Sequence, residues 1–507
     1  MFHSHRFVRC FAVFFSFILI VNSLAVVSLA ADEDAKRPNI LFIYTDDHSY
    51  RTVGCYPDSF DWVRTPAIDR LAQRGMRFDA AYIGTWCMPS RASLLTGHHQ
   101  FGVESMRMEG DYPGSAYDPE QCPFWPSVFR QQGYVTGQIG KWHTGTDTGF
   151  GRDWDYQLVW NRPLHTSTAG HYYYDQPITY HGGETKILER YSTDQYSDWA
   201  IDFIRGEGRD PDKPWYLWLC YGAVHGPYTP ADRHLNEYAD AEVPTPADIF
   251  PPRAGKPAWA QRIDNWTKGP GGEPMFRDRT LQSWVHQYHQ AVRAIDEGVG
   301  RVLEALDETS QRENTLVVLT ADQGFAWGQH GFRHKVAAYD SNIRAPMIVS
   351  MPGRVPEGSV CRTPVGGIDL VPTFFGLAGI DVPWEMHGHD LQPLLSNPEA
   401  EWDHPVLLTN TGQQYGSNTN NPPTGEEAFF QNIPWYVMLR EQRYKYVRPM
   451  VAGEQEELYD LQNDPDELEN LSAQPEHQQT LHRMRDSAIT ELRRTNAGFV
   501  DNLPPVE

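Results

Sequence analysis

Cysteine is scarce in this sequence, with 6 residues among 507. No Cys-x-x-Cys pair and no Cys/His spacing typical of zinc sites occurs, which argues against a zinc centre. Basic residues are also few, because 43 Lys and Arg stand against 66 Asp and Glu, a formal charge of -23. Bulk electrostatics therefore does not favour nucleic acid or an acidic membrane surface as a partner. An anionic substrate would need a local positive pocket.

Beyond residue 30, no segment is long and apolar enough to suggest a membrane span. At the start, Arg6 and Arg9 flank an apolar run over residues 10–27, and Ser28-Leu29-Ala30 supplies the small residues that a signal peptidase reads. We predict a signal peptide over residues 1–30, hence a secreted or periplasmic protein with no stable membrane insertion after cleavage. Retention of the run as an anchor is the alternative. Cleavage leaves five cysteines, an odd number, so at least one is unpaired or altered.

Short apolar runs alternate with helical patterns along most of the chain. The predicted strands span residues 39–45, 76–82, 134–139, 215–220, 315–320 and 346–350, and the predicted helices span residues 66–75, 89–97, 194–205 and 281–306. This alternation predicts an α/β fold with a large, mostly parallel central sheet flanked by helices. We assign it to a main domain over residues 31–380.

The pattern changes from about residue 381. Two short strands, 435–440 and 444–447, are predicted to pair as a hairpin, and a helix is predicted over residues 478–494. We therefore predict a small α+β subdomain with an antiparallel sheet over residues 381–507. The Pro- and Gly-rich span 244–274 is predicted to be a long surface insertion.

Polar side chains gather where the predicted strands end, which is where open α/β sheets bind ligands. The groups that follow strands are Asp46-Asp47, Lys141-Trp142-His143, His225 and Asp322-Gln323. The acidic residues and the amide offer only oxygen ligands, which Ca²⁺ and Mg²⁺ prefer, whereas zinc or copper would favour imidazole or thiolate. Taken singly, Asp46-Asp47 and Asp322-Gln323 are each better explained as a helix cap or a turn.

The segment Cys87-Met88-Pro89-Ser90-Arg91 begins a predicted helix. Free N–H groups and the helix dipole favour negative charge at such a position, and Arg91 lies on the same helical face as Cys87. These features predict a nucleophilic cysteine of low pKa. A structural cysteine is the alternative.

Continued to Leu95-Thr96-Gly97, this segment resembles the signature of type I sulfatases of the alkaline phosphatase superfamily. In that family a maturation enzyme oxidises the cysteine to formylglycine. Other stretches resemble the family in order and spacing: Gly140-Lys141-Trp142-His143, residues 221–228 around His225, residues 320–324, His330-Gly331, Lys335 and residues 457–465. The resemblance covers about residues 38–471 and implies an alkaline-phosphatase-like sandwich.

The resemblance also implies a cation site. A divalent ion, Ca²⁺ with Mg²⁺ as the alternative, would be bound by Asp46, Asp47, Asp322, Gln323 and the formylglycine made from Cys87. The ion would lower the pKa of one hydroxyl of the hydrated aldehyde and polarise a sulfate oxygen. Gln323 departs from the Asn that is most familiar at its position, and its longer arm leaves the preferred metal open.

The remaining roles also follow from the resemblance. Arg91 would stabilise the developing alkoxide, and Lys141, Lys335 and His225 would bind sulfate oxygens. His225 or Lys335 would protonate the leaving alcohol, and His143 would accept the proton from the second hydroxyl, which releases sulfate. Arg333 and His334 adjoin Lys335 and are alternatives to it.

The expected reaction is the hydrolysis of a sulfate ester, and the expected partners are a sulfated small molecule or glycan and a formylglycine-generating enzyme. A phosphodiesterase or phosphonate monoester hydrolase of the same superfamily is one alternative. A non-catalytic relative that binds sulfated glycans is another, with the aromatic segment 154–180 stacking on sugars. Substrate specificity is expected in that segment and in residues 244–274.

Overall fold

The computed structural model describes residue 1, residues 37–105 and residues 118–506. Residues 37–507 form one compact unit. The expected signal peptide and its apolar run lie outside the described residues. Within the described residues, no helix combines the length and the apolar character needed to cross a bilayer. The division at residue 380 stays a prediction.

An eleven-stranded mixed sheet forms the centre of the molecule, in the order β13-β2-β12-β11-β1-β7-β3-β4-β5-β6, with β14 also paired to β2. Its strands are β1 (Asn39–Thr45), β2 (Met76–Tyr82), β3 (Val135–Trp142), β4 (Tyr156–Asn161), β5 (Gln176–Tyr180), β6 (Thr185–Leu188), β7 (Trp215–Cys220), β11 (Thr315–Ala321), β12 (Arg344–Ser350), β13 (Ser359–Cys361) and β14 (Val365–Gly366). The middle of the sheet, from β11 to β4, is parallel. The antiparallel pairs involve β12, β5 and β6.

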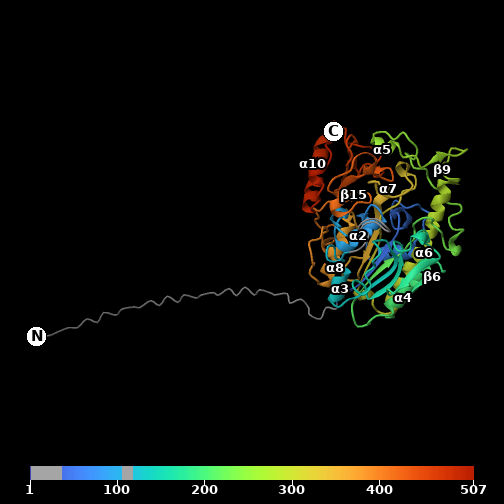
Figure 1. The fold of residues 1–507 in the computed structure, drawn as a ribbon, viewed down its shortest axis with the longest axis vertical. Helices are drawn as coiled ribbons and strands as arrows, with labels where there is room; N and C mark the ends of the chain where they lie inside the picture. The colour runs from blue at the N-terminus through green and yellow to red at the C-terminus, as the bar shows by residue number, and fades with distance from the viewer. Residues whose placement is uncertain (2–36, 106–117, 507) are drawn as a thin grey trace. The chain divides into compact units, whose positions relative to one another are not determined.

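Helices cover both faces of this sheet, because side chains of a strand point alternately to its two faces. Along β1, Leu41 and Ile43 pack with α1, α4 and α6, whereas Ile40 and Phe42 pack with α2, α3 and α8. Figure 1 shows α3 and α8 on one side of the sheet and α4 and α6 on the other. The helices are α1 (Pro66–Gln73), α2 (Cys87–Thr96), α3 (Pro126–Gln131), α4 (Ser192–Ile204), α6 (Leu281–Glu308) and α8 (Leu370–Ala378). The expected α/β sandwich is confirmed.

A second, antiparallel sheet follows in the C-terminal part, in the order β15-β18-β19-β20. Its strands are β15 (Val406–Asn410), β18 (Tyr436–Arg440), β19 (Tyr444–Pro449) and β20 (Glu457–Asp460). The predicted hairpin is β18 with β19. Helix α10 (Gln478–Arg494) packs on this sheet through Leu481, Met484 and Leu492. The predicted α+β subdomain is therefore present.

Residues 244–274 are not only a surface insertion. They contain α5 (Ala258–Gln261) and part of a small sheet of β8 (Thr267–Lys268), β9 (Pro274–Phe276) and β10 (Arg279–Thr280). Trp259 and Trp266 are 2% and 1% exposed and join the core on opposite faces of the main sheet. The Pro and Gly content misled the prediction, because two large indole side chains anchor the segment in the core by burying apolar surface.

The five cysteines that the structure describes are free thiols: Cys55, Cys87, Cys122, Cys220 and Cys361. All but Cys55 are buried. Of the two alternatives that the sequence leaves open, the structure favours buried thiols over disulfides.

Candidate active site

The carboxyl ends of β11, β1, β7 and β3 lie side by side and form the floor of the candidate site. Thr45 of β1 is in register with Ala321 of β11, and Cys220 of β7 is in register with Tyr44 and with Gly140 of β3. The polar groups that follow these strands therefore emerge at one edge of the sheet, as expected. Lys141 differs in one respect from the prediction: β3 continues to Trp142, so Lys141 lies within the strand.

Asp46 is fully buried and contacts two cations. Its Oδ2 lies 2.9 Å from Nη2 of Arg91 and forms an ion pair with Nζ of Lys141. Arg91 also lies 3.4 Å from Oδ2 of Asp322 and donates to the carbonyl of Lys141. The guanidinium, itself 0% exposed, lies 5.0 Å from the ring of Tyr44. Arg91 thus ties the acidic groups after β1 and β11 to each other.

Asp47 adopts a left-handed backbone conformation, with φ of 53°. This conformation costs free energy in a non-glycine residue and is found mainly where surrounding contacts hold it. The Asp47 amide donates to Oδ1 of Asp322 at 2.9 Å, and the carboxylate contacts Nζ of Lys335 and Nε2 of Gln323. Its other oxygen lies 3.6 Å from Nε2 of His225. The side chain is thereby fixed toward the site.

Helix α2 begins at Cys87, two residues before the predicted start at Pro89, and the side chain of Cys87 faces the two aspartates. Its Sγ lies 3.4 Å from Oδ1 of Asp46, 3.9 Å from Oδ1 of Asp47 and 2.9 Å from Nζ of Lys335. Of the three adjacent basic residues 333–335, Lys335 is the one in contact with this sulfur. The ligand atoms of Asp46, Asp47, Cys87 and His225 all lie within 4.8 Å of one another.

The prediction of a low-pKa thiol at position 87 is wrong. Burial, followed by the negative charge of Asp46, raises the pKa of Cys87 above its usual range, despite Lys141 and Lys335 nearby. Arg91, which was expected to activate the thiol, is turned to Asp46 and Asp322 instead. The unmodified thiol is therefore a poor nucleophile in this environment.

The three carboxylates respond differently to burial. Burial alone would raise the pKa of Asp46, but Lys141, His225 and Arg91 hold that pKa well below its usual range. Burial raises the pKa of Asp47, and burial together with Asp46 raises the pKa of Asp322 to about 7. Carboxylates crowded in this way are in a suitable environment to bind a divalent cation.

Gln323 also indicates a cation-binding site. Its side chain is 0% exposed, and its Oε1 is buried without a hydrogen-bond partner among the described residues. A buried amide oxygen without a partner costs free energy unless a cation or a donor satisfies it. The oxygen-rich donor set of Asp46, Asp47, Asp322 and Gln323 thus fits a hard cation.

Two neighbours of the site, the aromatic Tyr172 and the basic Arg162, were not predicted to act there. The ring of Tyr172 is stacked on His225 at 3.9 Å between centroids and lies 5.0 Å from Nζ of Lys141. Arg162 contacts Nε2 of His143 through Nη1. Tyr172 was expected to be core or a sugar platform, and at 2% exposure it is not open to sugars. The sequence around Arg162, Trp160-Asn161-Arg162-Pro163, contains no motif that identifies this residue.

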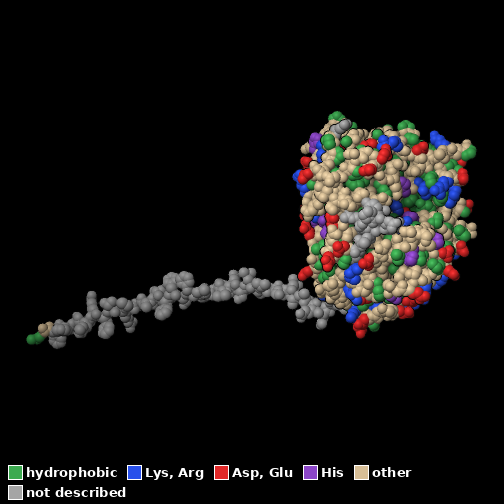
Figure 2. All heavy atoms as spheres, viewed as in Figure 1, with side chains coloured by type: hydrophobic (Ala, Val, Ile, Leu, Met, Phe, Trp, Pro, Cys, Tyr) green, Lys and Arg blue, Asp and Glu red, His purple; other side chains and the backbone are tan. Residues whose placement is uncertain are grey.

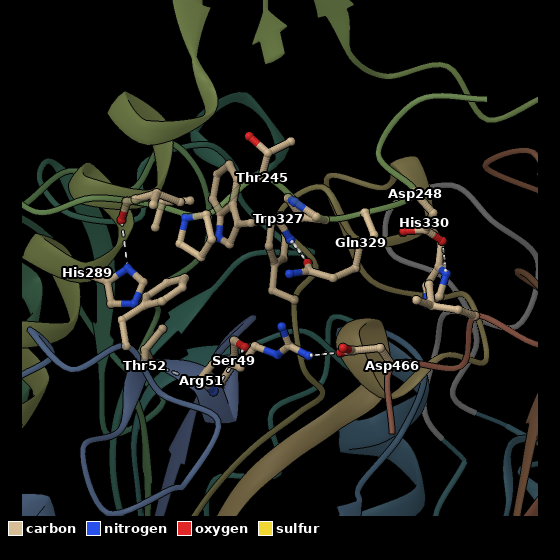
Figure 3. Close-up of a pocket in the computed structure, with 18 residues that line it drawn as sticks. Ser49, Arg51, Thr52, Thr245, Asp248, His289, Trp327, Gln329, His330 and Asp466 are labelled. Carbon is tan, nitrogen blue, oxygen red and sulfur yellow. Dashed lines mark hydrogen bonds and ion pairs between the residues drawn. The ribbon is translucent and has the colours of Figure 1, made fainter. Parts of the chain in front are cut away.

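The site opens into a cleft of about 460 Å³, which Asp47, His225 and Lys335 line together with Trp284 and Phe325. Phe325 also borders a second cavity of about 230 Å³, lined by residues of 49–60, 243–248, 325–330 and 466–468. Figure 3 shows Arg51 paired with Asp466 on one side of that cavity and His330 paired with Asp248 on the other. His330, part of the resemblance, therefore lies outside the catalytic cleft.

A profile described as sulfatase matches residues 38–380. The chain belongs to the sulfatase family. A second profile, described as the C-terminal part of N-sulphoglucosamine sulphohydrolase, matches residues 426–495. The expected family and enzyme class are confirmed.

Curated relatives of this sulfatase span nearly its whole length. The chain is 28% identical to an N-acetylglucosamine-6-O-sulfatase of Bacteroides thetaiotaomicron, over 95% of this chain and 91% of the relative. It is 26% identical to the human N-acetylglucosamine-6-sulfatase, over 90% of this chain and 84% of the relative.

Solved structures agree on the fold. One, a protein in complex with its substrate D-glucosamine-2-N,6-O-disulfate, superposes with a TM-score of 0.76 at 25% identity and covers 92% of this chain and 99% of its own. A phosphonate monoester hydrolase of Silicibacter pomeroyi superposes with a TM-score of 0.69 at 23% identity, covering 91% and 96%. This second likeness shows only that the two proteins share a fold.

Proposed function

We propose that this sulfatase removes sulfate from sulfated carbohydrates of the glycosaminoglycan type, using a formylglycine made from Cys87 and a bound calcium ion. One observation carries the proposal: Sγ of Cys87 lies between two carboxylates and the Lys335 ammonium, 2.9 Å from the latter. Sγ stands where an oxygen of the modified side chain would lie. A nucleophilic oxygen there faces cation ligands on one side and a sulfate-binding charge on the other.

Each residue has a role that its surroundings support. Lys141 and Lys335 are buried cations, and their carboxylate neighbours raise the pKa of both lysines against the effect of burial, so both stay charged. Positive charge fixed at this depth binds sulfate oxygens and stabilises the negative charge that moves during transfer. Arg91 would stabilise the departing oxygen and also holds Asp46 in place.

Histidine residues would handle the protons. Burial, with Lys335 next in effect, holds the pKa of His225 well below its usual range. The Lys335 ammonium holds a proton that it can donate to the leaving alcohol, either directly or through the neutral His225, which would take up that proton as it gives its own to the alcohol. His143, held by Arg162, would accept the proton that frees sulfate from the enzyme.

The cation would be held by Asp46, Asp47, Asp322, Gln323 and the modified residue 87. When bound, such an ion polarises a sulfate oxygen and lowers the pKa of a coordinated hydroxyl. The all-oxygen donor set favours Ca²⁺, with Mg²⁺ as the alternative. The unpartnered Oε1 of Gln323 supports this choice.

The substrate class rests on the relatives. The two N-acetylglucosamine-6-sulfatases named above act on sulfated amino sugars by name, and the bound sugar of the solved relative is a sulfated glucosamine. We extend this class to the present chain, with secretion or periplasmic export through residues 1–30. The signature must also meet the maturation enzyme before folding, because Cys87 and Arg91 are 2% and 0% exposed in the folded chain.

The test is sulfate release from p-nitrophenyl sulfate and from N-acetylglucosamine 6-sulfate, by protein co-expressed with a formylglycine-generating enzyme. We expect release from both, loss of release with EGTA, and restoration by Ca²⁺. Cys87→Ala abolishes release, whereas Cys361→Ala, which removes another buried thiol, retains it. Bis(p-nitrophenyl) phosphate and a phenylphosphonate ester are the comparison substrates.

The outcomes separate the alternatives. Faster turnover of the phosphate diester or the phosphonate than of either sulfate ester would favour the superfamily alternative. Binding of sulfated sugars without turnover of any ester, by protein with a modified residue 87, would favour a non-catalytic glycan-binding relative.

A further inference from the structure

Three arginines line the outer part of the catalytic cleft. Arg277 and Arg279 flank the turn between β9 and β10, and Arg333 precedes Lys335 by two residues. All three border the same cavity of about 460 Å³ as Asp47 and Lys335. On the face in Figure 2, Lys and Arg side chains gather beside a hollow, on the side where Figure 1 labels β9.

Aromatic rings, and not carboxylates, hold these guanidinium groups. Arg279 lies 3.9 Å from the ring of Trp284, and Arg333 lies 3.9 Å from the ring of Phe276. Arg279 also donates to the hydroxyl and carbonyl oxygens of Ser283. Within the described residues, none of the three arginines forms an ion pair, in contrast to the half-buried Arg293, which pairs with Glu237.

The electrostatics of the cluster agree with this geometry. Burial lowers the pKa of Arg279, and burial, with Arg277 contributing, lowers that of Arg333. Positive charges that repel each other, and that no carboxylate among the described residues pairs with, are unusual in a chain with a formal charge of -23. Such charges are stabilised when an external anion binds.

We propose that Arg277, Arg279 and Arg333 form a subsite for a second anionic group of the substrate, a sulfate or carboxylate on the sugar next to the reacting sulfate. This inference rests on the proposed function and names its substrate as an oligosaccharide with at least two anionic groups. Guanidinium is suited to this task, because its planar fork binds sulfate and carboxylate oxygens through two parallel hydrogen bonds. Because the chain has a formal charge of -23, bulk electrostatics does not attract anions, and their recognition depends on this local cluster of positive charge.

The test is competition. Hydrolysis of p-nitrophenyl sulfate, which carries one anionic group, is measured with heparin, chondroitin sulfate and ι-carrageenan tetrasaccharides as inhibitors. For the parent enzyme, we expect at least one tetrasaccharide to inhibit competitively. Its inhibition constant should rise with salt concentration, because the contact is ionic. Arg279→Gln and Arg333→Gln each raise that constant by about tenfold, the loss expected for one charge-assisted contact.

Two further variants separate the loss of a subsite contact from changes in packing and from the loss of one positive charge. Arg277 is exposed and lies 5.3 Å from the ring of Phe276, so Arg277→Gln tests the subsite and leaves the closer contacts of Arg279 with Trp284 and of Arg333 with Phe276 in place. Arg354 is an exposed arginine that does not line the cleft, and Arg354→Gln is the matched control for loss of one positive charge. We expect a several-fold rise in the inhibition constant for Arg277→Gln and no change for Arg354→Gln.

The outcomes are distinct from those for the proposed function. If p-nitrophenyl sulfate is not hydrolysed, the proposed function fails. If it is hydrolysed but no tetrasaccharide competes, or the cleft variants and Arg354→Gln change the inhibition constant equally, the second-anion subsite is contradicted while the sulfatase reaction stands.

Discussion

The ring of Tyr172 lies flat against the imidazole of His225, with centroids 3.9 Å apart and ring planes within 3° of parallel. The same ring lies 5.0 Å from Nζ of Lys141. Tyr172 therefore positions two groups that we assign to sulfate binding and proton transfer, without facing the substrate itself.

The contact gives a prediction about catalysis. Tyr172→Leu removes the stacked ring and is expected to lower kcat/KM for p-nitrophenyl sulfate by about tenfold, since such contacts contribute about 1 kcal/mol or more. Tyr172→Phe keeps the ring and is expected to stay within about twofold of the parent, because the Tyr172 hydroxyl has no hydrogen-bond partner among the described residues.

The pH dependence of kcat/KM separates positioning from a general loss of structure. A shifted pH profile in Tyr172→Leu, with a parent-like profile in Tyr172→Phe, supports the role of the ring in setting the environment of His225. Equal losses in both variants, with unchanged profiles, would argue against it.

Arg91 bridges Asp46 and Asp322 inside the protein, and its removal leaves buried carboxylates without a partner. Arg91→Met is expected to lower the free energy of unfolding by about 3 kcal/mol or more. Arg74→Met is the control, because Arg74 pairs with Asp307 on the surface, and we expect a change within about 0.5 kcal/mol. Urea unfolding without the maturation enzyme measures both, so that the state of residue 87 is the same. A loss below about 1 kcal/mol for Arg91→Met would count against the bridging role.

Gln323 offers a buried oxygen for a cation, and calcium should therefore stabilise the protein through it. We expect the melting temperature to rise with Ca²⁺, as for any ligand that binds only the folded state. Gln323→Leu is expected to shift the midpoint of this titration to about tenfold more Ca²⁺. Gln100→Leu, a buried glutamine bonded to backbone carbonyls far along the chain, should leave the midpoint unchanged. An identical midpoint in Gln323→Leu would remove Gln323 from the cation site.

A cluster of buried histidines predicts how stability depends on pH. Burial and the neighbours His99, His98 and Arg494 lower the pKa of His387 to about 2. An unfolded histidine binds a proton near pH 6.5, so between about pH 6.5 and 2 the unfolded state binds more protons than the native state. Stability from this group is complete above about pH 6.5 and is lost as the pH falls, by up to about 1.4 kcal/mol per pH unit.

His387→Gln removes the titrating imidazole. The glutamine still offers an acceptor for the His99 amide, which donates to Nδ1 of His387 at 3.0 Å in the parent. Between pH 7 and pH 5, the variant should lose about 2 kcal/mol less unfolding free energy than the parent. His482→Gln, at an exposed position of α10, should lose as much unfolding free energy as the parent over the same pH range. Parallel losses in all three proteins would show that His387 is not the titrating group.

Much of the fold could be predicted from the sequence, because the central strands are continuous apolar runs. The bounds of β1 and β7 match the predictions to the residue, since a parallel strand buried on both faces must be apolar throughout. The end of β3 could not be predicted in this way. The sequence predicts that Lys141 follows the end of the strand. Lys141 is nevertheless buried within β3, because the carboxylate of Asp46 neutralises its charge.

The residues of the candidate site also fall into two groups, those that the sequence could predict and those that it could not. Residues within motifs, such as Cys87 and Asp322, could be found from local spacing. Tyr172 and Arg162 could not, because their contacts with His225 and His143 join segments 53 and 19 residues apart that only the folded sheet brings together. The raised pKa of Cys87 was missed for a related reason, since Asp46 lies 41 positions away in sequence.

The most direct test of the account is the mass of the peptide that contains residue 87, from protein co-expressed with a formylglycine-generating enzyme. We predict the mass of an aldehyde in place of the thiol, in protein that releases sulfate from p-nitrophenyl sulfate and stops when EGTA is added. An unmodified Cys87, in a preparation where a control sulfatase is fully converted, would contradict the proposed catalytic mechanism.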